Sequence, residues 1–290
     1  MSFDALQRRI DALQNPTVVG LDPTAALVPP QLLAAEVTLD KAILEYNFAL
    51  IDALCDIVPA VKPQSAYYEA LGVVGASVLR DTCAYARERG MYVILDAKRG
   101  DIGSTAEAYA QAYLGATSDF AVDALTVNAY LGSDGILPFY NEAKANDKAL
   151  FVLVKTSNPS SGELQDLYAG EKKVFEHMGD LLERLGADSL GEFGYSRLGA
   201  VVGATYPAEL AAQRLRTPST FFLVPGYGAQ GGGAADVAGA FDAHGRGAIV
   251  NSSRAIIGAW KKTGDGSDFA DAARNEALRM RDDLRSTSVL

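Results

Sequence analysis

Asp96, Lys98 and Asp101 stand close together directly after the apolar run Met91–Leu95. A short apolar run bounded by charge is typical of a buried strand in an α/β protein. If the strand continues past Leu95, Asp96 and Lys98 point to one side and Arg99 to the other. Carboxylates close to a lysine favour its charged form, so we expect Lys98 to be a proton donor rather than a nucleophile. The alternative is a structural ion-pair cluster at a strand end, which usually contributes little.

The residues that follow this cluster are expected to form a helix beginning near Ser104. Asp101 and Thr105 are four residues apart, and this spacing places two side chains on one face of a helix. We therefore expect the side chains of Asp101 and Thr105 to project from the same face of this helix.

A glycine-rich run, Gly226–Gly233, is the second candidate for chemistry, with five glycines in eight residues and Gln230 among them. Glycine allows backbone N–H groups to converge on an anion. The run follows a seventh apolar segment, and Ser253 and Arg254 follow an eighth. Barrels commonly bind phosphate between the loops after strands seven and eight, and arginine can hold two phosphate oxygens at once. The pattern predicts a phosphate site; plain loop flexibility is the alternative.

These residues require a scaffold of alternating strands and helices. Eight apolar runs are expected to be strands, at residues 17–21, 57–61, 91–95, 121–127, 149–154, 198–203, 221–224 and 248–250. Helical patterns separate them, which favours a parallel sheet closed into a single (β/α)8 TIM barrel domain over residues 1–290. We expect an additional N-terminal helix and an extended segment after the fifth strand. A doubly wound open sheet is the alternative, but no boundary between two halves is evident.

Polar or flexible residues follow nearly every predicted strand. In a barrel these ends meet on one face, which carries the chemistry. Turns are often polar in any protein, which alone could explain residues such as Asn128 and Ser157. A lysine directly after a buried strand is harder to explain as an ordinary turn residue. The residues concerned are Asp22, Lys62, Asp96, Asn128, Ser157, the glycine-rich run and Arg254.

Composition excludes several classes of function. The net charge of −10 opposes binding to nucleic acid or to anionic membranes, and no apolar run is long enough to span a bilayer. The only cysteines, Cys55 and Cys83, lack metal-type spacing and suggest free thiols in a reducing, cytoplasmic compartment. The two histidines lie in helix-like sequence and argue against a histidine triad or a multi-histidine metal site.

Taken together, the motifs resemble those of orotidine 5′-phosphate decarboxylases, in the longer bacterial form. The resemblance rests on Asp96-x-Lys98-x-x-Asp101, Lys62-Pro63-Gln64, Thr156-Ser157-Asn158-Pro159, the run from Pro225 through the glycines, and Arg254. It implies decarboxylation of orotidine 5′-phosphate to uridine 5′-phosphate in pyrimidine synthesis, without a cofactor or metal.

The resemblance also implies roles for individual residues. Lys98 would protonate C6 of the pyrimidine within a catalytic set that includes Asp96 and Asp101. Asp101 and Thr105 would reach across a homodimer interface into the neighbouring site. The substrate-binding residues would be Asp22 and Lys62 at the ribose, Ser157 at the pyrimidine edge, and Pro225, Gly226, Gln230, Ser253 and Arg254 around the phosphate. Asn128 and Asn158 are either pyrimidine contacts or turn residues.

Three other functions fit parts of this pattern. A metal-dependent phosphosugar synthase or lyase could use the same barrel and charged residues. A Schiff-base aldolase would need Lys98 as a neutral amine, which flanking carboxylates oppose. A non-catalytic nucleotide-binding barrel would not need the Asp-Lys-Asp array.

Overall fold

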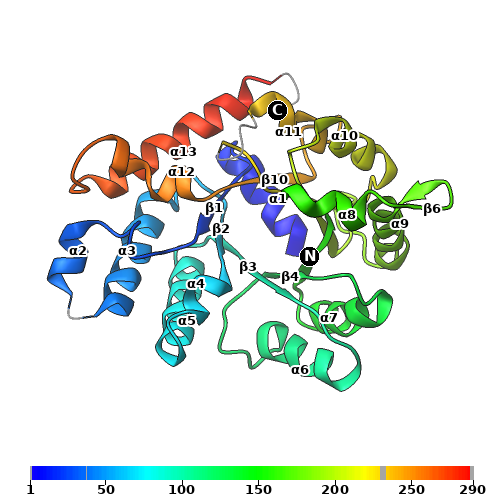
Figure 1. The fold of residues 1–290 in the computed structure, drawn as a ribbon, viewed down its shortest axis with the longest axis horizontal. Coiled ribbons are helices and arrows are strands. Elements are labelled where there is room, and N and C mark those ends of the chain that lie inside the picture. Colours follow the sequence, from blue (N-terminus) through cyan, green and yellow to red (C-terminus); the bar gives the residue numbers. More distant parts are fainter. Residues whose placement is uncertain (1, 37, 229–232, 288–290) are drawn as a thin grey trace.

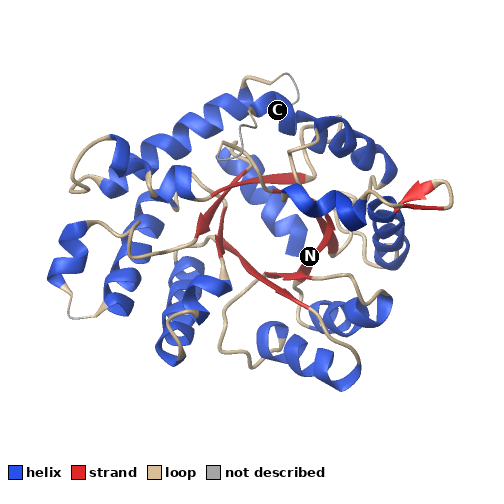
Figure 2. Cartoon of the chain, viewed as in Figure 1, coloured by secondary structure: helices blue, strands red, loops and turns tan. Residues whose placement is uncertain are grey.

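Eight parallel strands close into a barrel in the computed structural model, which describes residues 2–36, 38–228 and 233–287. The strands are ordered β1-β10-β9-β8-β5-β4-β3-β2 around the ring. Figure 2 shows this ring at the centre of the molecule with helices outside it. The predicted TIM barrel is confirmed. Its strands are β1 (Thr17–Leu21), β2 (Ala60–Pro63), β3 (Tyr92–Arg99), β4 (Ala124–Val127), β5 (Ala149–Lys155), β8 (Leu198–Val202), β9 (Phe222–Val224) and β10 (Ala248–Ser252).

Most of the helices surround the ring and cover its outer face (Figure 1). One apolar cluster fills the space between strands and helices, and a second fills the barrel interior. The longer helices are α1 (Ser2–Leu13), α3 (Leu39–Leu54), α5 (Val73–Glu88), α6 (Gly103–Leu114), α7 (Ser133–Ala145), α9 (Val174–Gly186), α10 (Pro207–Arg216) and α13 (Phe269–Arg285). Shorter ones are α2 (Pro30–Ala35), α4 (Ser65–Glu69), α8 (Gly162–Gln165), α11 (Ala234–Val237) and α12 (Arg254–Ile257).

The predicted N-terminal helix, α1, packs into the barrel interior. Phe3, Leu6 and Ile10 belong to the interior cluster, as their spacing of three and four residues on one helix face allows. The Phe3 ring lies 4.9 Å from that of Phe151 and 5.0 Å from that of Phe221, centroid to centroid. Phe151 lies near the start of β5, and Phe221 directly precedes β9. Because both rings stand at the N-terminal ends of strands, α1 fills the interior from the end opposite the strand C-termini.

Several predicted boundaries differ from the structure; β4, for example, starts at Ala124 rather than at Ala121. The second strand starts at Ala60 rather than Ile57, because the N–H groups of Ile57 and Val58 bond to Leu54 O and finish the preceding helix. The extended segment after β5 ends where α9 starts, at Val174.

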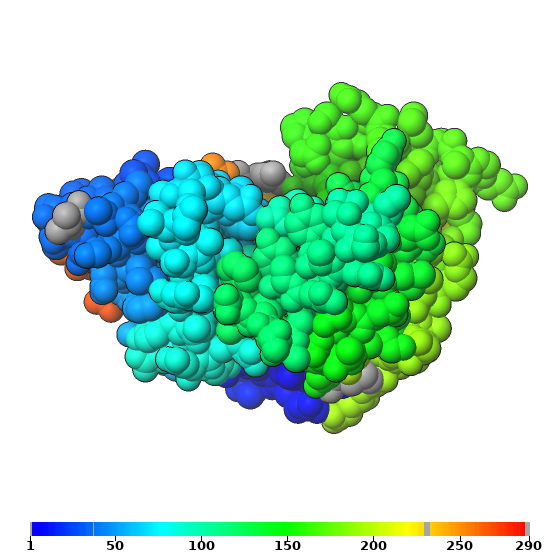
Figure 3. Space-filling model, turned by 90° about the horizontal axis from the view of Figure 1, so that it is seen from below, coloured from blue at the N-terminus to red at the C-terminus, as the bar shows by residue number. Residues whose placement is uncertain are grey.

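The extended segment after β5 contains a hairpin that the sequence did not reveal. Its two antiparallel strands are β6 (Tyr168–Ala169) and β7 (Lys172–Lys173). Two residues per strand are too few to produce a recognisable alternation of apolar and polar residues. In Figure 3 the green part of the chain, which includes this segment, rises above one side of the barrel. Within the described ranges, no helix has the length and apolar character to cross a bilayer.

Candidate active site

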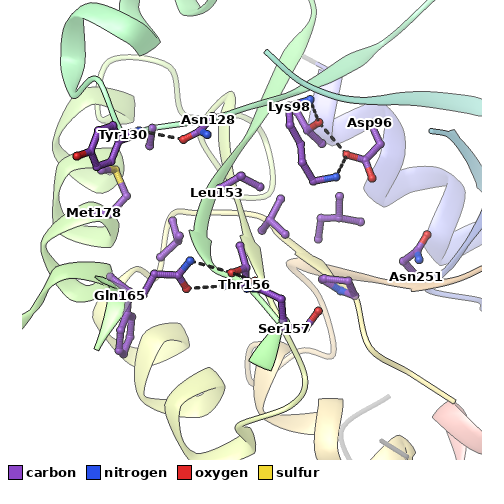
Figure 4. A pocket seen from close by; sticks show the side chains of 18 of the residues that line it. Asp96, Lys98, Asn128, Tyr130, Leu153, Thr156, Ser157, Gln165, Met178 and Asn251 are labelled. Carbon is purple, nitrogen blue, oxygen red and sulfur yellow. Dashed lines mark hydrogen bonds and ion pairs between the residues drawn. The ribbon is translucent and has the colours of Figure 1, made fainter. Parts of the chain in front are cut away.

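A cavity of about 790 Å³ lies at the carboxyl ends of the strands. Most of the barrel strands contribute to its lining, directly or through the residue that follows the strand. Figure 4 shows side chains from opposite sides of the barrel pointing into it. The predicted site residues that line the cavity are Asp22, Lys62, Asp96, Lys98, Ser157, Pro225 and Ser253.

Asp96 is the centre of the polar part of this cavity. Its Oδ2 accepts hydrogen bonds from Lys62 Nζ at 2.8 Å and Gln64 Nε2 at 3.0 Å. Its Oδ1 accepts from Lys98 Nζ at 2.6 Å and Thr126 Oγ1 at 3.0 Å. Both oxygens are therefore satisfied by donors from three neighbouring strands and the residue after β2, which holds the carboxylate in one orientation.

The two lysines that bond to Asp96 differ in how exposed their side chains are. The Lys62 and Asp96 side chains are 6% and 10% exposed, whereas that of Lys98 is 45% exposed. Lys62 is thus a buried partner of Asp96, and Lys98 is the ammonium that faces the open cavity. Lys98 is therefore the more accessible of the two cations that line the cavity.

The charges at this centre stabilise one another. Burial disfavours ionisation of Asp96, but Lys62 and Lys98 outweigh that effect and hold its pKa well below the usual range. Burial also disfavours the charge of Lys62, yet Asp96, and then Asp22, raise the Lys62 pKa above its ordinary value. Asp96 is therefore a carboxylate, and Lys62 an ammonium, at neutral pH.

The backbone around Lys98 departs from regular strand geometry. Three residues of β3, from Asp96 to Lys98, stand opposite the single residue Thr126 of β4 in the ladder. Lys98 has φ of 47°, in the left-handed region that non-glycine residues seldom adopt, and its N–H bonds to Thr126 Oγ1 at 2.8 Å. Such conformations persist only where surrounding contacts enforce them, and they cluster at functional sites.

The sequence model of the "Orotidine 5'-phosphate decarboxylase / HUMPS family" matches residues 16–267. That range contains every strand of the barrel and all residues of the Asp96 centre. The chain belongs to this family.

Curated relatives in the family cover nearly the whole chain. Orotidine 5′-phosphate decarboxylase of Rhodopirellula baltica is 44% identical over 283 residues, which cover 93% of this chain and 94% of the relative. The enzyme of the same name from Clostridium perfringens is 42% identical over 268 residues, covering 92% of each chain.

Solved structures of family members share the fold. A crystal structure from Streptomyces avermitilis superposes with a TM-score of 0.83 at 37% identity, covering 99% of this chain and 95% of the other. The OMP decarboxylase of Leishmania donovani gives a TM-score of 0.74 at 33% identity, with 97% and 98% covered.

Gln64 and Thr126 belong to this site although sequence reasoning assigned them no role. Gln64 stands next to the Lys62-Pro63 motif, so its place in the motif was a usable signal. Thr126 resembles any β-branched residue of a buried strand, and nothing in its local sequence marks it. Only the pairing of β3 with β4 brings its hydroxyl to Asp96.

Asp101 and Thr105 do not line the cavity of their own chain. The prediction that both lie on one helix face was wrong for Asp101, because α6 starts at Gly103 and leaves Asp101 in the preceding loop. Its carboxylate accepts the N–H of Ile102 at 2.9 Å. Within the described chain Lys98 is paired with Asp96, and the place of Asp101 beside Lys98 of a neighbouring subunit stays a prediction.

The predicted phosphate side of the site is described only in part. Pro225 and Ser253 line the cavity, and Gly226 has φ of 110°, which favours glycine. Arg254 begins α12 as an exposed side chain outside the lining, and Gln230 falls outside the described residues.

Asn251 is a further cavity residue that the sequence did not single out. It lies in β10, and its buried Oδ1 has no hydrogen-bond partner among the described residues.

Asn128 and Asn158 line the cavity and also stabilise turns. Asn128 Oδ1 accepts the N–H of Tyr130 at 3.0 Å. Asn158 Oδ1 accepts from Thr156 Oγ1 at 2.6 Å, and its Nδ2 donates to Ser160 Oγ at 3.1 Å. Both residues therefore form turn hydrogen bonds and also border the cavity, and a contact with the pyrimidine stays a prediction.

The titratable side chains of the described ranges include no group of three or more His, Cys, Asp or Glu residues suited to hold a metal ion. His177 is an exposed residue of α9, as predicted. His244 was expected on a helix but lies exposed in a turn.

Proposed function

We propose that this protein decarboxylates orotidine 5′-phosphate to uridine 5′-phosphate, as the names of its curated relatives suggest. The observation that carries the proposal is the half-exposed Lys98 ammonium, oriented by the ionised Asp96 in a cavity at the catalytic face of the barrel. An oriented cation suits a reaction that develops negative charge on carbon.

In this reaction the bond from C6 to the carboxylate carbon breaks, and carbon dioxide leaves. The electron pair remains on C6, where the nearby Lys98 ammonium stabilises it without reorienting. Lys98 then transfers a proton to C6, and its neutral amine regains one from water. Asp96 holds Lys98 in place. Its negative charge would also repel the carboxylate of the bound substrate.

The remaining contacts are those that the family resemblance implies. Asp22 and Lys62 would bind the ribose hydroxyls, because they are neighbours at the ends of β1 and β2. Ser157 would contact the pyrimidine edge. The phosphate would lie near Pro225, Gly226, Gln230, Ser253 and Arg254, after β9 and β10, and its binding energy can support closure around the reacting carbon.

A homodimer would complete this site, with Asp101 and Thr105 entering the partner's cavity. A second cavity, of about 490 Å³, lies beside Lys98 and provides space for an incoming carboxylate. Large apolar side chains are exposed on the same side of the molecule, including Ile102 (53% exposed), Tyr130 (77%) and Leu131 (47%). Such exposure is typical of an interaction surface.

The proposal includes neither a metal nor a cofactor, and it places the protein in the cytoplasm. Its two cysteines are unpaired thiols, in keeping with a reducing compartment. The matched family also covers HUMPS proteins, so a metal-dependent phosphosugar reaction is the competing function.

The decisive experiment follows loss of orotidine 5′-phosphate by ultraviolet absorbance with excess EDTA present. We expect turnover in EDTA and none in Lys98→Ala. Absence of turnover by folded wild-type protein, with EDTA or with added magnesium, would contradict the proposal. Turnover only with magnesium would favour the metal-dependent alternative.

A further inference from the structure

Lys155 is the last residue of β5 and is almost completely buried, with a side chain 2% exposed. Strict alternation along β5 would place it on the same face as Phe151 and Leu153, which pack in the barrel interior. It would then point into the substrate cavity like Lys98. The structure places it elsewhere.

An irregularity in the ladder between β5 and β8 reverses the direction of Lys155. Leu153 pairs with Val201, but Lys155 pairs with the next residue, Val202, so that Val154 is one extra residue on β5. Val201 faces the barrel interior and Val202 the helices. Because the side-chain period of a strand is two, one extra residue moves Lys155 to the helix side.

On that side Lys155 enters a group of four charged residues, which we name the β5 clasp: Lys155, Asp166, Lys173 and Glu209. Lys155 Nζ lies 2.5 Å from Asp166 Oδ1 and 3.5 Å from Glu209 Oε2. Lys173 Nζ lies 2.7 Å from Glu209 Oε1 and 3.6 Å from Asp166 Oδ1. The formal charges sum to zero, so every charge in the clasp has opposite charges beside it.

Aromatic rings surround the ammonium of Lys155. Its Nζ lies 5.2 Å from the centroid of Phe175 and 5.0 Å from that of Tyr206, within the range of cation–π attraction. A lysine buried to this extent is costly unless it is paired. The clasp therefore requires that Asp166 stay against the end of β5.

Asp166 follows directly on α8, whose last residue forms part of the cavity wall. Gln165 Oε1 accepts the N–H of Thr156 at 2.9 Å, and Gln165 Nε2 donates to Thr156 Oγ1 at 2.8 Å (Figure 4). Lys155 and Thr156, the last residue of β5 and the first residue after it, thus bond to Asp166 and Gln165, two consecutive residues in the middle of segment 156–173. Thr156, Leu164, Gln165 and Phe175 all line the cavity.

We propose that Lys155 is a positioning residue that fixes segment 156–173 as a wall of the substrate cavity through its ion pairs with Asp166 and Glu209. It touches no reacting atom. The proposal rests on the proposed function for its substrate, but the order of the wall can be measured without turnover.

The informative variant is Lys155→Met, which keeps the apolar stem between the two rings and removes the charge. We expect amide hydrogen exchange in segment 156–173 to speed up at least tenfold, while exchange in the barrel strands is unchanged. The dissociation constant of uridine 5′-phosphate and the KM for orotidine 5′-phosphate should each rise about tenfold, because a smaller fraction of the protein has the wall in place. The kcat should stay within about twofold, since Asp96 and Lys98 are untouched.

Two further variants control this experiment. Lys155→Arg keeps a positive charge and should restore most of the affinity. Lys144→Met removes a lysine that is likewise ion-paired, to Asp188 at 2.7 Å, and lies 5.3 Å from the ring of Tyr140, but stands on α7 away from the cavity. It should leave exchange, KM and kcat unchanged.

If Lys155→Met does not fold, Asp166→Asn removes the same ion pair from the half-exposed side. Unchanged exchange in segment 156–173 in the folded variant would overturn the proposal. So would faster exchange throughout the barrel, because Lys155 would then be a general stability residue. If wild-type protein neither turns over orotidine 5′-phosphate nor binds uridine 5′-phosphate, the proposed function fails, and the exchange of this segment alone decides the role of Lys155.

Discussion

The ammonium of Lys98 lies 2.6 Å from Asp96 Oδ1, two residues away on the same strand, while the backbone of Lys98 is in the left-handed region. A regular strand would carry Lys98 further along the barrel axis. The irregular pairing of β3 with β4 instead holds it against Asp96, with Thr126 bonded both to the carboxylate and to the N–H of Lys98. The charged pair is therefore oriented before any substrate binds.

Replacing Lys98 by alanine should reduce turnover of orotidine 5′-phosphate by at least about 10³-fold, as for other groups that stabilise developing charge. Binding of uridine 5′-phosphate should change little, because the product no longer carries the carboxylate or the charge on C6. Ultraviolet assays and calorimetry measure the two quantities. Lys41→Ala, at an exposed lysine of α3, is the matched control and should behave as wild type. Substantial turnover by Lys98→Ala would show that another group provides the proton.

Thr126→Val removes one hydroxyl while keeping the shape of a buried side chain that is 1% exposed. The change leaves the Lys98 N–H without its acceptor and removes one donor to Asp96, at a cost of about 1–3 kcal/mol. We expect kcat to fall about tenfold with little change in KM. Thr117→Val, at an exposed threonine, serves as the control. An unchanged kcat would mean that Thr126 does not contribute to the orientation of Lys98.

A shared active site predicts complementation between two inactive variants. Lys98→Ala and Asp101→Ala should each be inactive, yet a mixed dimer would contain one site with both residues intact. Random mixing of equal amounts should restore about a quarter of wild-type activity, since half of the dimers are mixed and one of their two sites is complete. Native mass spectrometry can verify that mixed dimers form. Inactivity of verified mixed dimers would rule out Asp101 as a shared residue.

Stability should depend on the ionisation of Asp96. Its folded-state pKa lies below the unfolded value of about 4. Its contribution to the free energy of unfolding is therefore fully present above that pH and is lost as the pH falls through the folded-state pKa. At pH 7, Asp96→Asn should lower the free energy of unfolding by about 3–5 kcal/mol, because it leaves buried Lys62 without its partner. Urea unfolding from about pH 6 down to pH 3 should show the difference from wild type shrinking.

The raised pKa of Lys62 predicts that the protein also loses stability at alkaline pH. Its folded-state pKa is raised, so its contribution is full below the unfolded value of about 10.4 and declines as pH rises through the folded value. Asp134→Asn, at an exposed carboxylate, is the control and should differ from wild type by a small, nearly constant amount. A difference for Asp96→Asn that does not vary with pH would contradict the stabilising role of the pair.

Sequence alone was sufficient for the barrel and for much of its catalytic face. Apolar runs separated by helical patterns indicated eight strands, and polar residues that follow most of these runs line the cavity. This works because strand and helix periodicities are local, and because all parallel strands of a closed barrel point the same way. Asp22, Lys62, Asp96, Lys98 and Ser157 could therefore be placed without coordinates.

What the tertiary structure decided was the direction in which strand-end lysines point. Lys98 and Lys155 both stand at or just after the end of a buried apolar run, and strict strand alternation would point both side chains into the cavity. In β3 three residues stand opposite one, so two are extra and alternation is kept, which leaves Lys98 facing the cavity. In β5 a single extra residue reverses alternation and turns Lys155 toward the helices. These registers are set by hydrogen bonding to a neighbouring strand, whose residues are distant in the sequence. The periodicity of a single strand therefore cannot predict them.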